Sequence, residues 1–198
     1  GTDPREIPLY GLNETARYLR LHINTLRSWV LGRTYFAQNE QKKSLPVIHL
    51  PDKNKPLLSF MNLVEIHVLS AITRVHKVHL KKVRTALEYL EDKFPSDHPL
   101  ADKQFWTDDF ELYFEYHKDL ICASRDGQIV MKEVIEQYLQ RIDRDNFDKT
   151  PLRIYPFSKE ILFSSLKDNP KEVLEKTPKN ISIDPLIAFG RPTIAGTG

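Results

Sequence analysis

The chain has 198 residues, of which 40% are hydrophobic and 28% are charged. This balance is typical of a soluble globular protein with one large or two small domains, and it excludes an intrinsically disordered chain. No apolar run approaches the roughly 20 residues that cross a bilayer, and no signal segment opens the chain, so we expect a cytoplasmic protein without a membrane partner. The single cysteine, Cys122, excludes an internal disulfide and a multi-cysteine zinc site.

The net charge of +2 conceals an asymmetry between the two halves. Residues 1–94 contain 15 Lys and Arg against 9 Asp and Glu, a net of +6, whereas residues 95–198 contain 14 against 18, a net of −4. We expect such a division if the basic half meets nucleic acid and the acidic half meets protein, although charges scattered over a solvated surface give the same totals. The chain opens with Gly1 rather than Met, so its first residues are left out of the fold prediction.

Residues 12–32 are predicted to form a helix-turn-helix. Apolar residues recur there at helical spacing in two groups, Leu12, Ala16, Leu19 and Leu21, then Leu26, Trp29 and Val30. Gly32 can take the left-handed conformation that ends the second helix. The polar residues of that helix then point outward. Asn can pair with adenine and Arg with guanine or phosphate, although many short helical hairpins with a polar outer face bind no DNA.

A sequence pattern within this segment resembles the first DNA-binding element of MerR-type regulators. The pattern A-x-x-L-x-L-x-x-x-T-L-R-x-W runs from Ala16 to Trp29. Arg20 stands where such motifs often carry a glycine in the turn. The resemblance implies a winged helix-turn-helix, in which a β-hairpin wing lies beside the recognition helix and touches the phosphate backbone.

Residues 33–55 are predicted to form this wing, around a strand at Val47–Leu50 and a turn at Asp52–Asn54. Lysines in this segment would position the protein on the backbone without reading sequence, and these are Lys42, Lys43, Lys53 and Lys55. A plain flexible loop is the alternative.

Two helices are expected next, at residues 60–75 with Ser59 as the cap and at residues 80–94 ending before Pro95. Two roles are open for the basic residues of these helices: they contact phosphates, or they only keep the helix pair soluble. These residues are Arg74, Lys77, Lys81, Lys82 and Arg84. Three nearby histidines, His67, His76 and His79, lack a fourth ligand, so we expect no metal and no cofactor.

The second half is predicted to form a small α+β unit. Alternating residues 111–117 and the run 120–123 read as strands, Arg125–Gly127 as a tight turn and Ile129–Val130 as the return arm. A helix at 131–142 and a strand at 152–157 complete the unit. A lysine-rich linker follows, in which Asn169-Pro170 can start one short helix.

No enzyme is expected. His117, Asp119 and Cys122 lie near one another in the sequence, but a cysteine within an apolar run behaves as a small hydrophobe. The chain contains no phosphate-binding glycine loop, no HExxH motif and no nucleophile elbow.

The last residues carry the pattern I-D-P-x-x-x-F-G-R-P-x-I-x-G-T, from Ile183 to Thr197. This resembles the opening of a bacterial domain family of unknown function found in antitoxin-like proteins, whose members continue through several helices. The chain would therefore stop at the truncated start of that domain. Together with residues 16–30, 57–69 and 126–142, the pattern makes the chain resemble VapB-type antitoxins with a MerR-like N-terminal domain.

The predicted fold class is α+β, with an N-terminal MerR-like winged helix-turn-helix domain (6–95), a small α+β unit (96–158), a linker (159–180) and an extended C-terminal segment (181–198). The resemblance implies a homodimeric antitoxin that represses its own operon on double-stranded DNA and neutralises a PIN-type ribonuclease toxin. The alternative is a MerR-type regulator whose α+β unit senses a small ligand. The candidate DNA-binding residues are Arg17, His22, Asn24, Thr25, Arg27, Ser28, Arg33, Lys42, Lys43, Lys53 and Lys55.

Overall fold

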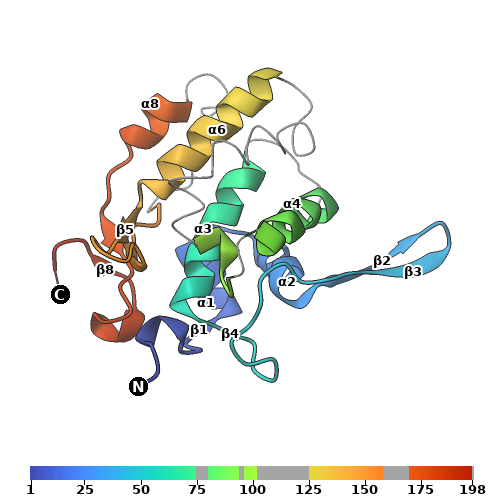
Figure 1. The fold of residues 1–198 in the computed structure, drawn as a ribbon, viewed down its shortest axis with the longest axis horizontal. Helices are drawn as coiled ribbons and strands as arrows, with labels where there is room; N and C mark the ends of the chain where they lie inside the picture. The colour runs from blue at the N-terminus through green and yellow to red at the C-terminus, as the bar shows by residue number, and fades with distance from the viewer. Residues whose placement is uncertain (75–79, 94–95, 102–124, 158–169, 198) are drawn as a thin grey trace.

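The computed structural model describes residues 1–74, 80–93, 96–101, 125–157 and 170–197 (Figure 1). Its helices are α1 (Leu12–Tyr18), α2 (Ile23–Leu31), α3 (Phe60–Arg74), α4 (Leu80–Lys93), α6 (Arg125–Leu139) and α8 (Pro170–Glu175), with 3-10 turns η1 (Pro4–Glu6), η2 (Pro99–Ala101) and η4 (Ala188–Gly190). Its strands form antiparallel pairs, β1 (Tyr10–Gly11) with β4 (Leu57–Leu58), β2 (Arg33–Ala37) with β3 (Glu40–Ser44), β5 (Ile142–Arg144) with β6 (Pro151–Ile154) and β7 (Ile181–Ser182) with β8 (Thr193–Ile194).

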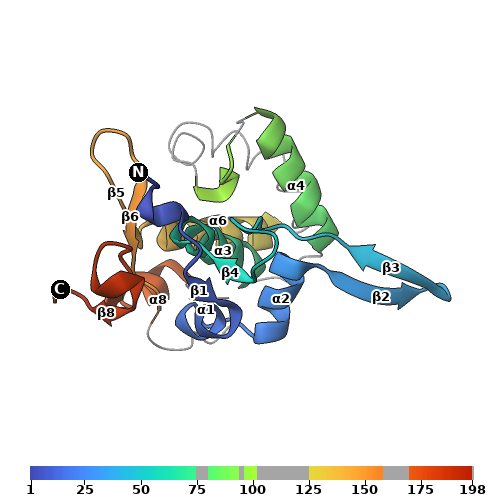
Figure 2. The ribbon, with the colours of Figure 1, turned by 90° about the horizontal axis from the view of Figure 1, so that it is seen from below.

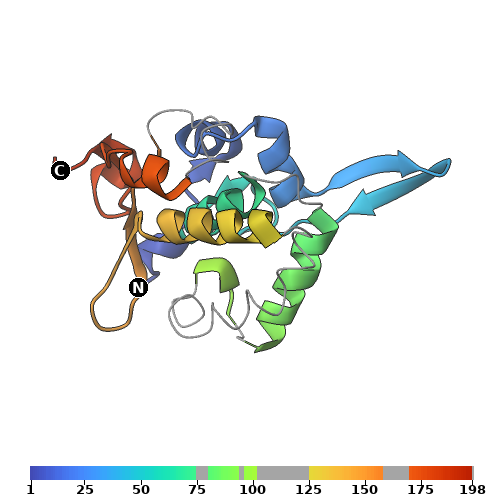
Figure 3. The ribbon, with the colours of Figure 1, turned by 90° about the horizontal axis from the view of Figure 1, so that it is seen from above.

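Helix α3 forms the centre of the molecule. Residues 62–72 along it are all buried, and α6, η1 and η2 pack around it (Figure 3). A helix that is buried on every side is mostly apolar, which explains the run of Leu, Val and Ile, and its buried polar residues such as Asn62, His67 and Ser70 have hydrogen-bond partners. The predicted cap at Ser59 is confirmed, because its Oγ accepts a hydrogen bond from the Asn62 N–H at 3.1 Å while the Asn62 side chain accepts from the Ser59 N–H at 3.0 Å.

The predicted helix-turn-helix is present as α1 and α2. Leu26, Trp29 and Val30 are buried, and the Leu21 N–H donates to the Ala16 carbonyl at 2.9 Å, which closes the end of α1. Arg20 adopts the left-handed conformation, with φ of 57°, at the position where similar motifs carry glycine. Its Nε donates to the Phe157 carbonyl at 3.4 Å, so the turn is fastened to the strand β6 side of the molecule.

The segment predicted to form the wing does contain a β-hairpin, but its strands lie before the strand predicted at Val47–Leu50. Strands β2 and β3 pair from Arg33 with Ser44 to Ala37 with Glu40. They are joined by Gln38 and Asn39, both at positive φ, as a tight two-residue hairpin turn requires. The flexible-loop alternative is therefore wrong.

The predicted strand at Val47–Leu50 is also wrong. The Val47 and Ile48 N–H groups both donate to the Trp29 carbonyl, at 2.8 and 3.0 Å, and Ile48 is buried. These β-branched residues pack against the end of α2 instead of pairing with another strand.

The predicted turn at Arg125–Gly127 and strand at Ile129–Val130 are wrong, because α6 begins at Arg125. Val130, Val134 and Tyr138 are spaced by four residues, as in a helix, but the short apolar run Ile129–Val130 is also compatible with a strand. The helix also ends at Leu139 instead of residue 142, since Ile142 begins β5. The strands expected at 111–117 and 120–123, with His117, Asp119 and Cys122, lie outside the described residues.

The C-terminal elements pack onto the core. The predicted short helix at Pro170 is confirmed as α8, and its Leu174 is buried. Ile183 exchanges backbone hydrogen bonds with Ile154 of β6, and the Tyr10 hydroxyl donates to the Gly190 carbonyl at 2.7 Å. The first strand and the last segment of the chain therefore lie together.

Gly32→Ala is expected to lower the free energy of unfolding by about 2–4 kcal/mol, measured by urea denaturation. Gly32 has φ of 79°, and a Cβ there would collide with the carbonyl oxygen of Ser44. Gly196→Ala is the matched control, because Gly196 has φ of 83° but nothing within 4 Å of an added Cβ. Equal losses in the two variants would show that the contact with Ser44 contributes nothing.

Candidate nucleic-acid interface

Helix α2 presents a polar face to solvent. Leu26, Trp29 and Val30 are buried on its inner face, and α1 packs against α2, whereas Asn24, Thr25 and Arg27 are exposed and Ser28 is half-buried. His22 caps the helix, because its Nδ1 accepts a hydrogen bond from the Asn24 N–H at 3.2 Å. Asn24, Thr25 and Arg27 are therefore free of the helix's own packing, whereas the His22 ring is occupied by the cap.

The β2–β3 hairpin projects away from the body of the molecule, starting directly after α2 (Figure 2). Side chains alternate between its two faces, and Tyr35 pairs with Lys42 and Phe36 with Gln41. One face carries Arg33, Tyr35, Lys42 and Ser44, and the other carries Thr34, Phe36, Gln41 and Lys43. The two candidate lysines of the hairpin therefore lie on opposite faces.

Arg84 of α4 holds the base of the hairpin, a role that the sequence did not indicate. Its Nη2 donates to the Ser44 hydroxyl at 3.3 Å and to the Leu45 carbonyl. The face that contains Ser44 is thus turned toward α4. The signal in the sequence is weak: Arg84 lies between Val83 and Leu87, which are both buried, and so borders the apolar stripe of α4.

The other predicted contact residues are more dispersed. Arg17 is exposed on α1, with its guanidinium 5.7 Å from the centre of the Tyr18 ring. Lys53 and Lys55 are exposed but lie outside the hairpin, in the loop before β4, where the Asp52 carboxylate accepts from the Asn54 N–H at 2.9 Å. That loop and the hairpin project in different directions (Figure 1). The structure therefore brings Lys42, Lys43 and Arg33 to one hairpin and separates Lys53 and Lys55 from it.

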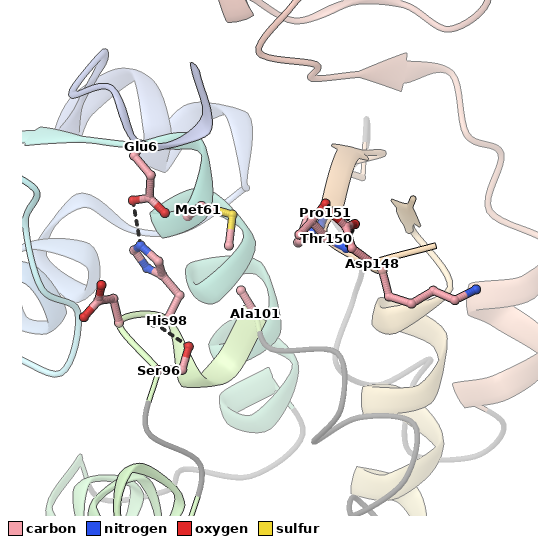
Figure 4. Close-up of a pocket in the computed structure, with 10 residues that line it drawn as sticks. Glu6, Met61, Ser96, His98, Ala101, Asp148, Thr150 and Pro151 are labelled. Atoms are coloured by element: carbon pink, nitrogen blue, oxygen red, sulfur yellow. Dashed lines mark hydrogen bonds and ion pairs between the residues drawn. The ribbon is translucent and has the colours of Figure 1, made fainter. Parts of the chain in front are cut away.

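A hollow of about 450 Å³ lies on another part of the molecule, between η1, α3, residues 96–101 and the turn from β5 to β6 (Figure 4). Three acidic residues, Glu6, Asp97 and Asp148, line it together with the basic His98 and Lys149. Asp148 and Thr150 face His98 and Met61 across the hollow. Across the described ranges, no group of three His, Cys, Asp or Glu side chains is arranged to hold a metal ion.

His98 lies between two carboxylates at the edge of this hollow. Its Nε2 is 2.8 Å from Glu6 Oε2 and its Nδ1 is 3.1 Å from Glu65 Oε2. Burial acts to lower the pKa of His98, but hydrogen bonds and charge from Glu65 and Glu6 outweigh it and raise the pKa to about 9. Burial raises the pKa of Glu65, partly offset by hydrogen bonds from His98 and Asn62. The charged imidazole thus joins the N-terminal segment to α3.

Of the three histidines that the sequence analysis considered for a metal, His67 lies within the described residues and has a structural position. His67 is buried in α3, with its Nε2 2.8 Å from the Tyr138 carbonyl. It therefore ties α3 to α6. His76 and His79 lie outside the described residues.

Comparisons with known proteins support a DNA-binding role for the first half. Residues 8–87 match the family described as "Putative DNA-binding HTH domain". The chain is 27% identical over 209 residues to a Mycobacterium tuberculosis protein named "Putative antitoxin VapB45", and the alignment covers 98% of this chain and 79% of that protein. No solved structure matches the chain. The chain thus has an N-terminal helix-turn-helix domain and is similar along nearly its whole length to an antitoxin.

Among the described residues, no helix is long and apolar enough to cross a membrane.

Stability is expected to fall by about 2–3 kcal/mol between pH 6.5 and pH 9 through His98. Its folded pKa of about 9 lies above its ordinary value of 6.5, so the stabilisation is complete below pH 6.5 and is lost as the pH rises through 9. Urea midpoints at pH 6, 7.5 and 9 measure this loss. His98→Gln should flatten the pH dependence, whereas His49→Gln, which alters an exposed histidine, should retain it. A His98→Gln profile parallel to wild type would contradict the assignment.

Proposed function

We propose that the chain is a cytoplasmic DNA-binding antitoxin that represses its own operon and neutralises a PIN-type ribonuclease toxin. The observation that carries the DNA-binding part is the exposed face of α2, with Asn24, Thr25 and Arg27 free to reach base edges beside a projecting basic hairpin. The match of residues 8–87 to an HTH family supports the same role. The name of the M. tuberculosis relative supports the antitoxin role.

In this proposal α2 lies in the major groove. Asn24, Arg27 and Ser28 read bases, Thr25 contacts the groove beside them, and His22 lies near the phosphate at the helix N-terminus while it keeps its cap. Phosphates are held by Arg17, Arg33, Lys42 and Lys43, with Lys53 and Lys55 reaching the backbone from their separate loop.

Two copies are needed for useful specificity. Helix α2 has nine residues and reads only a few base pairs, so a homodimer would place two such helices in successive major grooves of a near-palindromic operator. The MerR-like type of the domain belongs to this proposal, because the β2–β3 hairpin directly after α2 has the position of a wing. The acidic second half supplies the toxin contact.

A second candidate function is favoured by the hollow beside His98. A regulator that senses a small polar ligand would bind it in this hollow, where Asp97 and Asp148 lie beside the basic Lys149. A ligand bound there would contact both α3 and the second half. Helix α3 in turn packs against the rest of the core, so the ligand would contact the element at the centre of the molecule.

The double variant Asn24→Ala, Arg27→Ala is expected to bind DNA about 100-fold more weakly, since each base-reading pair contributes about 1–3 kcal/mol. The probe is the duplex immediately upstream of the gene, measured by gel shift and fluorescence anisotropy. Both side chains are exposed, so the thermal unfolding midpoint should not change. Arg191→Ala removes an equally exposed charge from the C-terminal segment and should bind like wild type. Wild-type affinity in the double variant would refute the assignment to α2.

Co-expression with the product of the adjacent gene is expected to give a stable complex in which that protein's ribonuclease activity is suppressed. The double variant of α2 should still form the complex, because the proposed toxin contact lies in the other half. The antitoxin proposal fails if no complex forms. A ligand-dependent thermal shift of the chain alone, abolished by Asp97→Asn, would then favour the sensor.

A further inference from the structure

Among the described residues of the N-terminal half (1–94), Phe36 is the most exposed aromatic residue, with 77% of its surface accessible to solvent. It is the fourth of the five residues of β2, close to the turn of the hairpin, where it pairs with Gln41, and Tyr35 beside it is 40% exposed. In the described structure the hairpin has only two strands, and all of their residues except Ala37 and Ser44 are exposed. A single exposed apolar residue is common on protein surfaces, so the case for a contact here depends on the position of Phe36 and on the charges beside it.

The hairpin is anchored firmly at its base. Arg84 of α4 binds Ser44 and Leu45 on one side, and the backbone of Gly32 approaches the Ser44 carbonyl closely. Since Ser44 lies on the face turned toward α4, Phe36 and Lys43 lie on the opposite face, away from α4. The anchor thus fixes the direction in which Phe36 points.

Charge indicates what this face meets. Residues 33–44 contain three basic residues, Arg33, Lys42 and Lys43, and one acidic residue, Glu40, which gives a net charge of +2. The cores of protein interfaces are depleted of lysine, whereas minor-groove proteins combine basic side chains with an apolar wedge such as Phe. A polyanion with stacked apolar bases fits this surface better than a protein does.

The length of the hairpin fits the spacing of DNA grooves. Its strands have five residues each, which at about 3.4 Å per residue span about 17 Å. One turn of B-DNA rises about 34 Å, so this is close to half a turn, the step from a major groove to the adjoining minor groove. A hairpin that starts at the end of α2 therefore has the reach to enter the next groove.

We propose that the β2–β3 hairpin enters the minor groove beside the major groove that holds α2, and that Phe36 wedges at a base step and bends the duplex. Lys43, on the same face, contacts the flanking phosphates. The inference rests on the proposed DNA binding and adds to it the groove, the wedge and the bend. Pyrimidine–purine steps unstack most easily, so the sites should contain such a step at the wedge.

The test uses the full chain and a duplex selected by binding from a random-sequence library, labelled at both ends for energy transfer. Phe36→Ala should lose the bend at saturating protein and bind about 10-fold more weakly, with an unchanged salt dependence. Tyr35→Ala removes an aromatic residue from the opposite face and should retain the bend. Lys43→Ala should keep the bend and reduce the slope of log affinity against log salt by about one.

Each result decides the inference. If Phe36→Ala bends and binds DNA like wild type while Asn24→Ala, Arg27→Ala does not bind, the wedge is wrong and the proposed function stands. If Phe36→Ala instead loses self-association or the co-purified partner, the face is a protein contact and the wedge is wrong. If wild type selects no duplex from the library, the wedge and the proposed DNA binding both fail.

Discussion

The candidate interface depends on one backbone junction between α2 and the hairpin. The Trp29 carbonyl, at the end of α2, accepts hydrogen bonds from both Val47 and Ile48, which follow the hairpin. Gly32 allows the two strands to leave α2 side by side, because only a residue without Cβ fits against the Ser44 carbonyl at that positive φ. The residues that end α2 therefore also direct the hairpin, so the polar face of α2 and the hairpin are held in a fixed arrangement at this junction.

Buried polar groups join segments that are distant in the sequence. Arg141 is the clearest case: its guanidinium donates to the carbonyls of Tyr155, Pro156, Thr177 and Pro178, and burial lowers its pKa to about 10. The guanidinium also lies over the Phe157 ring, with its carbon 4.0 Å from the ring centre. A buried charge is tolerated when its donors are satisfied, and these four carbonyls satisfy it. His98 joins η1 to α3 through its two carboxylate partners, so Arg141 holds the segments after β6 and α8 together, and His98 holds the N-terminal segment to the core.

Local patterns predicted the elements that are amphipathic or capped. The helical spacing from Leu12 to Val30 and the cap at Ser59 depend on neighbours in the sequence, and both are confirmed. The strand expected at Val47–Leu50 failed because the partner of that segment is the Trp29 carbonyl, a contact that spacing does not reveal. The start of α6 was missed because a short apolar run is compatible with a strand or a buried helix until its packing on α3 is known. At the candidate interface, Arg27 and Asn24 followed from the outer face of α2, whereas Arg84 acts across 40 residues of sequence and left only a weak local signal.

The distribution of charge over the hairpin constrains how it can meet DNA. A wing that lies flat on one phosphate backbone uses one face, and its basic residues then gather on that face. Here Lys42 and Lys43 lie on opposite faces, and the face turned toward α4 is partly occupied at its base by Arg84. A two-stranded ribbon with a cation on each face matches a groove, because the two walls of a groove each carry a phosphate strand. The two-residue turn at Gln38–Asn39 fixes the pairing register of β2 with β3. This register places Lys42 and Lys43 on opposite faces, and that placement favours a hairpin that enters a groove over one that lies on a single phosphate backbone.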